Sequence, residues 1–168
     1  MERQQLVLTD PAELSPVVQA CLENGSEVVL TVTGNSMRPM LRHRRDQVIL
    51  KRCDPRHLQV GDLPLYRRAD GTLVLHRVVA LGVSTYTMCG DAQTEKEYGV
   101  PWNAVLAVAV GFHRGKKIVW CNRLSYRLYV RLWMLLMPLR PILLKGIRLM
   151  TRGYRKVRGI FQKKAGRS

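Results

Sequence analysis

The chain has 168 residues, with 28 Lys or Arg against 12 Asp or Glu and a formal net charge of +16. This length allows one domain of ordinary size with an appendage, and such a domain buries a core without help from a metal or a disulfide. The charge is uneven: residues 1–120 hold 15 Lys or Arg and all 12 acids (+3), whereas residues 121–168 hold 13 Lys or Arg and no acid (+13). We therefore predict an N-terminal segment (1–25), a nearly neutral body (26–120) and a basic tail (121–168).

A short helix is predicted in the N-terminal segment. Asp10 can cap it with Pro11 at the first helical position, and Asn24-Gly25 provides a stop. Its apolar face is formed by Val17, Val18 and Cys21. We expect no secretory signal peptide or anchor in Met1–Asp10.

A candidate nucleophile follows the first predicted strand. The β-branched run Glu27–Thr33 predicts a strand that ends at a Gly34-Asn35 turn, directly before Ser36. Serines in turns usually hydrogen-bond their own backbone, so the position by itself carries little weight. It does, however, present a hydroxyl at the end of a strand.

Two further strand patterns supply a histidine and a carboxylate. His76 lies in the middle of the apolar run Thr72–Ala80, and Asp91 lies in the Gly-Asp turn after Tyr86–Cys89. Serine, histidine and aspartate can act as nucleophile, general base and orienting acid, whatever their order in the chain. The pattern alone does not show that the three side chains converge.

Five short blocks follow one another in the body: Gly34–Pro39 (GNSMRP), Asp46–Leu50 (DQVIL), Leu58–Asp62 (LQVGD), Leu75–Val79 (LHRVV) and Gly90–Ala92 (GDA). In this order they resemble the serine box, the strand after it, the L-x-x-G-D turn, the general-base box and the G-D-A-N box of type I signal peptidases and their relatives. Most bacterial members have lysine where this chain has His76. Histidine there is similar to the endoplasmic-reticulum, archaeal and sporulation branch.

The resemblance implies a mainly β fold of coiled antiparallel sheets, partly barrel-like, over residues 26–120. It implies that Ser36 is the nucleophile, His76 the general base and Asp91 the orienting acid. The residues that it implies for the oxyanion and the substrate are Gly34, Asn35, Ser36, Met37 and Pro39. The chemistry agrees, because a serine hydroxyl needs a base and imidazole, with a pKa of about 6.5, can act as one near neutral pH.

The basic tail has helical periodicity in two stretches. The first has leucines spaced by four, four and three residues, beside an arginine stripe: Leu124, Leu128, Leu132 and Leu135 with Arg123, Arg127 and Arg131. After Pro138 and Pro141 a second apolar seam follows: Leu143, Ile147, Met150, Tyr154, Val157 and Phe161. These patterns predict two basic amphipathic helices that form a C-terminal appendage.

We expect this appendage to lie on an anionic membrane surface. Its longest uncharged apolar run, Leu132–Leu139, is far shorter than the roughly twenty residues that span a bilayer. The residues expected to contact the membrane are Arg127, Arg131, Trp133, Lys145, Arg148, Arg152 and Arg155. The alternative is that the apolar seams pack on the body or on each other. Nucleic-acid binding is not expected, because no helix-turn-helix or stacking-aromatic pattern accompanies the charge.

The cysteines point to neither a metal nor a disulfide framework. The four cysteines form no C-x-x-C pair, which predicts reduced thiols, with one disulfide as the alternative. They are Cys21, Cys53, Cys89 and Cys121. Cys53 and His57 have a loose metal-ligand spacing, but no second close pair accompanies them. No metal and no organic cofactor is expected.

Together these features predict a serine endopeptidase, resembling signal peptidase, that cleaves a peptide or protein near a membrane through an acyl-enzyme. The alternative is a catalytically silent binding module that keeps the fold and uses its basic tail to reach a membrane or a partner. The basic tail and the reduced thiols predict peripheral attachment at the cytoplasmic face.

Overall fold

The structure is a computed structural model that describes residues 15–142 and 145–146. The chain forms two compact units, which divide between Met134 and Leu135. The described part of the first unit is mainly β, as predicted, with antiparallel sheets and one helix at each end. The described residues also include three single-turn 3₁₀ helices: η1 (Pro55–His57), η2 (Trp102–Ala104) and η3 (Met137–Leu139).

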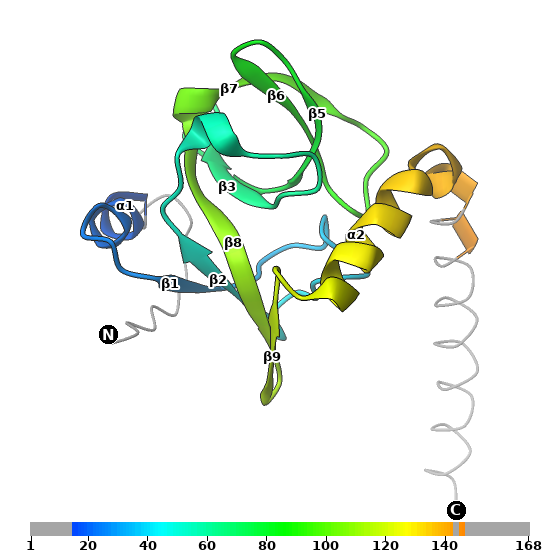
Figure 1. Ribbon diagram of the computed structural model, residues 1–168, viewed down its shortest axis with the longest axis horizontal. Coiled ribbons are helices and arrows are strands. Elements are labelled where there is room, and N and C mark those ends of the chain that lie inside the picture. The colour runs from blue at the N-terminus through cyan, green and yellow to red at the C-terminus, as the bar shows by residue number, and fades with distance from the viewer. Residues whose placement is uncertain (1–14, 143–144, 147–168) are drawn as a thin grey trace, which may run out of the picture. The chain divides into compact units, whose positions relative to one another are not determined.

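Two antiparallel sheets make up the described part of the body. The larger is a curled half-barrel in which the strands follow the order β1-β2-β8-β3-β4, with β9 also paired to β8 (Figure 1). Its strands are β1 (Val28–Thr31), β2 (Asp46–Lys51), β3 (Pro64–Arg67), β4 (Leu73–Leu75), β8 (Val105–Arg114) and β9 (Lys117–Trp120). The smaller sheet has the order β5-β6-β7, with β5 (Arg77–Leu81), β6 (Thr85–Cys89) and β7 (Glu97–Pro101).

The long strand β8 organises the larger sheet. It pairs with β2 and β3, and its end forms a hairpin with β9. Buried Val105, Ala107 and Ala109 alternate with half-buried neighbours, the period of two that gives a strand one core face. Pro64 begins β3, where its missing amide hydrogen removes no bond from the interior of the strand.

Helix α1 (Ser15–Glu23) ends where the sequence predicts. Gly25 has a φ of +75°, and its amide donates to the carbonyl of Leu22 while the amide of Ser26 donates to that of Cys21. This pair of bonds is the Schellman arrangement, which favours glycine at the left-handed position. The predicted start at Asp10 lies outside the described residues.

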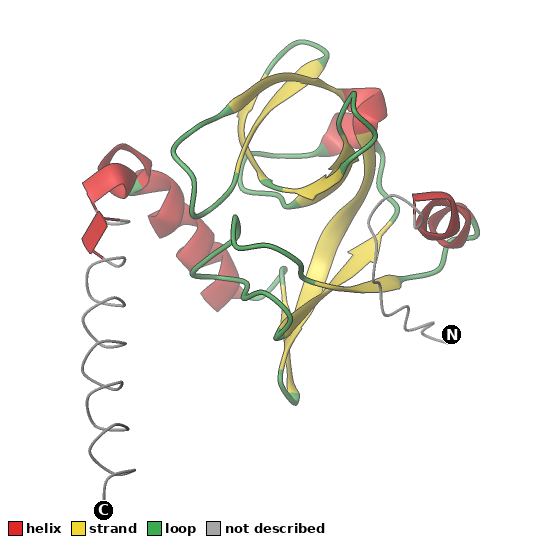
Figure 2. Ribbon diagram, turned by 180° about the vertical axis from the view of Figure 1, so that it is seen from behind, coloured by secondary structure: helices red, strands yellow, loops and turns green. Residues whose placement is uncertain are grey.

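Helix α2 (Leu124–Leu135), seen from behind in Figure 2, confirms the first predicted tail helix. The face that it buries is not the leucine stripe. Its buried residues are Tyr126, Val130 and Trp133, and the Tyr126 ring lies 5.9 Å from that of Phe112 in β8. The leucine stripe faces solvent, with Leu124, Leu128, Leu132 and Leu135 all more than half exposed. Aromatic side chains bury more area than leucines, which explains why their face packs inward.

Two expectations about the tail are corrected by this packing. Trp133 is buried in the body and does not face outward, so it is not available to contact a membrane. The first compact unit also runs to Met134, so the predicted boundary at residue 121 cuts off a helix that belongs to the body.

The remaining tail predictions are tested only in part. Arg127, Arg131 and Lys145 are exposed, whereas Arg148, Arg152 and Arg155 lie outside the described residues together with nearly all of the second predicted helix. None of the helices in the described ranges is long and apolar enough to cross a membrane.

Candidate functional site

Ser36 lies in the turn that joins β1 to β2. The turn opens at Gly34, whose φ of +89° is a conformation that residues with a side chain rarely adopt. The Gly34 amide donates to Nδ1 of His43 over 2.9 Å. Met37, Met40 and Leu41 are buried and anchor the turn in the core, while Ser36 itself remains half-buried.

The Ser36 backbone is fixed against the Gly-Asp turn that follows β6. The amide of Ala92 donates to the Ser36 carbonyl over 2.7 Å. A Cβ on Gly90 would lie 2.8 Å from the same oxygen, so this close approach requires glycine. Two of the blocks noted in the sequence, the serine turn and the Gly-Asp turn, therefore lie side by side.

His76 lies between β4 and β5 and is 2% exposed. Its Nδ1 is 3.1 Å from Oε1 of Glu97 and 3.3 Å from the Tyr66 hydroxyl. The Tyr66 hydroxyl donates its proton to the other oxygen of Glu97 over 2.8 Å, so it can only accept from the ring. Glu97 therefore favours the tautomer with hydrogen on Nδ1. Nε2, which bonds no group in the described chain, then keeps its lone pair.

Arg68 sets the charge state of this cluster. It donates from Nε to Oε2 of Glu97 over 2.9 Å and makes a second, closer contact from Nη2 to Oε1. Burial opposes ionisation of Glu97, but hydrogen bonds from Arg68 and Tyr66 outweigh it and lower the pKa of that carboxyl. Burial, aided by the charge of Arg68, lowers the pKa of His76, against the raising effect of Glu97. At neutral pH the ring is thus a neutral base beside an ionised carboxylate.

Asp91, the predicted orienting acid, forms a buried ion pair with Arg77. Both of its oxygens accept from Arg77, over 2.8 Å from Nε and 2.7 Å from Nη2, and both side chains are fully buried. Arg77 also donates to the carbonyl of Gly61 over 2.7 Å and contacts the Tyr126 hydroxyl. Asp91 is therefore part of a buried ion pair that joins β5, the Gly-Asp turn and α2. The Asp91 carboxylate is thus held against Arg77, whereas Nδ1 of His76 contacts Glu97.

The residues predicted to bind an oxyanion differ in what they offer. The Gly34 amide is engaged by His43, and Pro39 has no amide hydrogen. The amides of Ser36 and Met37 donate to no acceptor within the described part of the chain, so they are available to a substrate oxygen. The Asn35 residue is exposed to solvent.

Ser36 and His76 are not joined by a hydrogen bond in the described structure. They are linked indirectly: the Ser36 carbonyl bonds the turn that carries Asp91, and Asp91 pairs with Arg77, the residue directly after His76. Catalytic hydrogen bonds are often long or poorly aligned in the absence of substrate, and a serine and a histidine can form theirs when substrate binds.

Glu97 contacts His76 but is not among the site residues that the sequence predicts. It is the first residue of β7, and the register that pairs it with Met88 of β6 brings it to His76. In the sequence it follows Glu95 and Lys96, which resembles an ordinary solvated charge cluster. The only available indication was an acidic residue at the start of a strand soon after the Gly-Asp turn.

Two adjoining hollows, of about 370 and 530 Å³, lie apart from the residues of this site. Both are lined by Asp62 and Cys121, and the larger also by Cys53. Burial raises the pKa of each of the two thiols to about 11, which keeps them protonated and unreactive at neutral pH. No group of three or more metal-ligating side chains occurs among the residues that the structure describes.

Comparisons of the chain with protein-family models, curated proteins and solved structures found no match.

Proposed function

We propose that this protein is a serine endopeptidase, resembling signal peptidase, in which Ser36 is the nucleophile, His76 the general base and Glu97 the orienting carboxylate. The observation that carries the proposal is the contact between Glu97 and Nδ1 of buried His76, which leaves Nε2 to accept a proton. An acid, an imidazole and a hydroxyl in these roles define such sites irrespective of chain order. No cofactor is needed for this chemistry.

The reaction divides peptide hydrolysis into two steps. Ser36 Oγ attacks the carbonyl carbon while its proton passes to Nε2 of His76, and the amides of Ser36 and Met37 stabilise the developing oxyanion. The protonated imidazole then gives its proton to the leaving amine, which yields an acyl-enzyme. Water, deprotonated by His76, attacks the ester and releases the acid. Ionised Glu97 stabilises the imidazolium in both steps.

A covalent probe tests the nucleophile without knowledge of the substrate. A fluorophosphonate should label the wild-type chain and should not label Ser36→Ala or His76→Ala. Ser84→Ala is the matched control, because Ser84 is an exposed serine in the turn between β5 and β6 and has no role in the proposed reaction. Labelling that persists in Ser36→Ala would remove Ser36 as the nucleophile.

A catalytically silent binding module is the second candidate. The observation that favours it is that no hydrogen bond joins Ser36 to His76 in the described structure. Absence of labelling in a folded wild-type chain, judged by a cooperative unfolding transition, would support this candidate over the peptidase.

The proposal includes attachment to an anionic membrane through the outer face of α2. On this face, exposed Leu124, Leu128 and Leu132 lie beside exposed Arg127 and Arg131. Leucines can enter the interface while arginines meet acidic headgroups. Sedimentation with phosphatidylserine vesicles should weaken as salt rises, and replacing the three leucines by serine should reduce it. If the serine variant sediments with the vesicles as the wild type does, the proposed membrane attachment through α2 is wrong.

We assign the attachment to the cytoplasmic face. Reduced thiols are typical of that side of the membrane, and none of the four cysteines is joined to another by a disulfide. The substrate would then be a peptide or protein processed at this face.

A further inference from the structure

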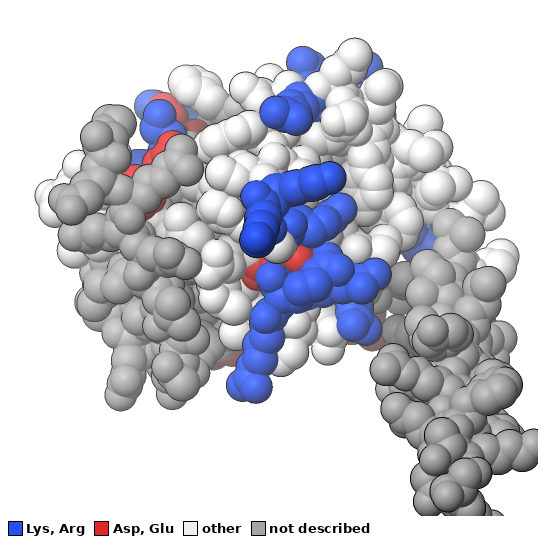
Figure 3. Space-filling model, turned by 90° about the horizontal axis from the view of Figure 1, so that it is seen from below, with Lys and Arg blue, Asp and Glu red and all other residues white. Residues whose placement is uncertain are grey.

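We infer that the surface beside the serine turn binds an acidic segment of the substrate, an inference that rests on the proposed peptidase function. The surface, termed the basic face, gathers exposed cations from the turn after Ser36 and from the β8–β9 hairpin. Its members are Arg38, Arg42, Arg44, Arg114, Lys116 and Lys117. Figure 3 shows Lys and Arg side chains grouped on the side of the body from which this hairpin projects.

Sheet pairing brings the two sources of the basic face together. Asp46, which ends the turn at the start of β2, pairs with Arg114 of β8, and Arg114 pairs in turn with Lys117 of β9. Cross-strand neighbours lie about 5 Å apart, so cations contributed by these three strand ends share one surface.

Hydrogen bonds fix the basic face to the turn that carries Ser36. Gly34 donates to His43, and the amide of Arg44 donates to the carbonyl of Val32 over 2.8 Å. On the other side of the turn, Arg114 donates to the carbonyl of Met40 over 2.7 Å. A substrate whose cleaved bond lies at Ser36 would therefore extend along cations that are held in place relative to the nucleophile.

The positive charge of this surface is not neutralised locally. The one carboxylate of the turn, Asp46, is fully buried and accepts two hydrogen bonds from Arg45. No acidic residue occurs in residues 32–45 or 105–117. Such a surface attracts carboxylates and raises the rate at which an acidic ligand arrives.

The composition of the basic face favours an acidic peptide over a membrane or a nucleic acid. Among described residues, the exposed large apolar side chains lie elsewhere, four of them on α2, and none lies in residues 32–45 or 111–117. Stable binding at a lipid interface requires apolar side chains that enter the acyl region. Binding of single-stranded nucleic acid generally adds exposed aromatic rings that stack on bases. A peptide with a run of Asp and Glu beside the cleaved bond can bind through the cations of the basic face alone.

Equilibrium binding to the full chain tests the inference independently of catalysis. The probe is a fluorescein-labelled oligoglutamate peptide, measured by anisotropy with Ser36→Ala so that no cleavage occurs. The face variant carries Arg42→Gln, Arg44→Asn, Lys116→Gln and Lys117→Gln. Arg44 has a φ of +53°, which Asn tolerates, and Arg45 and Arg114 are kept because they bond the fold.

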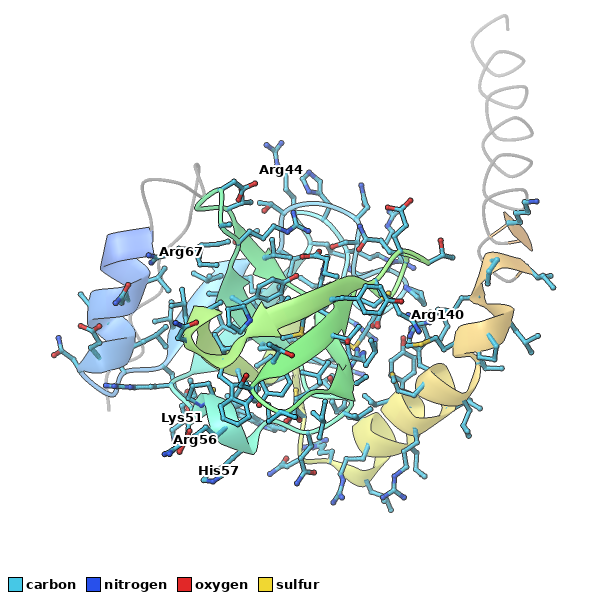
Figure 4. All side chains as sticks on the ribbon, turned by 90° about the horizontal axis from the view of Figure 1, so that it is seen from above. Arg44, Lys51, Arg56, His57, Arg67 and Arg140 are labelled. Carbon is cyan, nitrogen blue, oxygen red and sulfur yellow. The ribbon has the colours of Figure 1, made fainter. Side chains whose placement is uncertain are left out.

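The matched control removes four charges from other surfaces: Lys51→Gln, Arg52→Gln, Arg127→Gln and Arg131→Gln. All four residues are exposed, and Figure 4 shows Lys51 and Arg44 at opposite sides of the body. Both variants have the same net charge, so general attraction to the basic chain weakens equally in the two. A Lys116→Gln/Lys117→Gln variant, altered only at the hairpin, serves if the full face variant unfolds.

We expect the face variant to bind oligoglutamate roughly tenfold more weakly than the parent, and the control to change by roughly twofold or less. Equal weakening in both variants would overturn the inference. So would a larger loss for phosphatidylserine vesicles or single-stranded RNA than for the peptide. Because fluorophosphonate labelling of Ser36 does not depend on this binding, a labelled enzyme without peptide preference would refute the inference and leave the proposed function standing.

Discussion

Two carboxylates of the body each pair with an arginine, but their surroundings differ. Asp91 and Arg77 are both 0% exposed, and every described contact of the guanidinium is internal. Glu97 and Arg68 are 28% and 38% exposed, and Glu97 also contacts the ring of His76. Both are ion pairs with close donor–acceptor geometry, yet only the second includes a group that titrates near neutral pH.

The difference separates a structural pair from the pair that belongs to the proposed catalytic site. A sealed pair cannot exchange protons with a substrate, and its charges must remain matched because the interior does not solvate them. A half-exposed cluster can lose or gain a proton without unfolding the chain. We therefore expect the two clusters to respond to mutation in different observables, one in stability and the other in reactivity.

The largest expected effect is the loss of reactivity in Glu97→Gln. The amide removes the charge that stabilises the imidazolium and no longer favours hydrogen on Nδ1, so the rate constant of fluorophosphonate labelling should fall by roughly 10²–10⁴. Glu95→Gln, an exposed neighbour two residues away, should change the rate by roughly twofold or less. Equal rates in the two variants would show that Glu97 does not orient the base.

The next largest effect is expected in the stability of Arg77→Met. This substitution leaves the buried Asp91 carboxylate unpaired, which should lower the free energy of unfolding by about 3–5 kcal/mol. Arg77→Met/Asp91→Leu should recover most of this loss. Arg68→Gln, at the half-exposed pair, should lose no more than about 1 kcal/mol. Urea denaturation measures all three, and a larger loss in Arg68→Gln than in Arg77→Met would reverse the comparison.

A smaller effect is expected in the pH dependence of labelling. Because burial and Arg68 lower the pKa of His76, the ring is neutral at pH 7, and the rate should fall only on the acid side of about pH 6.5. In that acid range the unfolded chain binds a proton that the folded chain does not, so stability also falls as the pH is lowered. Arg68→Gln removes a nearby cation and should move the acid limb to higher pH. If the acid limb of the pH–rate profile is unchanged in Arg68→Gln, or moves to lower pH, Arg68 does not lower the pKa of His76.

The smallest effect is expected outside both clusters, on the outer face of α2. Leu128 is 54% exposed, so Leu128→Ser should change the free energy of unfolding by no more than about 0.5 kcal/mol and leave the labelling rate unchanged. Trp133→Ala, on the buried face, should lose about 3 kcal/mol or more. Similar losses of unfolding free energy in Leu128→Ser and Trp133→Ala would show that the leucine stripe packs against other residues in solution.

Local patterns in the sequence were sufficient to predict several secondary-structure elements and part of the candidate site. The apolar, β-branched runs predicted β1, and Asn24-Gly25 predicted the end of α1. The single strand expected over Thr72–Ala80 is divided at His76 into β4 and β5, which belong to different sheets. The order of five blocks led to Ser36 and His76 as a candidate pair. These features depend on residues that are close in the chain, where periodicity and turn chemistry act directly.

The sequence by itself determined a mainly β body with a candidate serine turn, a histidine within an apolar strand pattern and a first tail helix rich in arginine. Only the tertiary structure decided that Glu97 contacts Nδ1 of His76 and that Asp91 pairs with Arg77, because the register of β6 and β7 brings Glu97 to the ring. It also decided which face of α2 is buried. Both faces are apolar in the sequence, and only the fit of Tyr126, Val130 and Trp133 against the body distinguishes them.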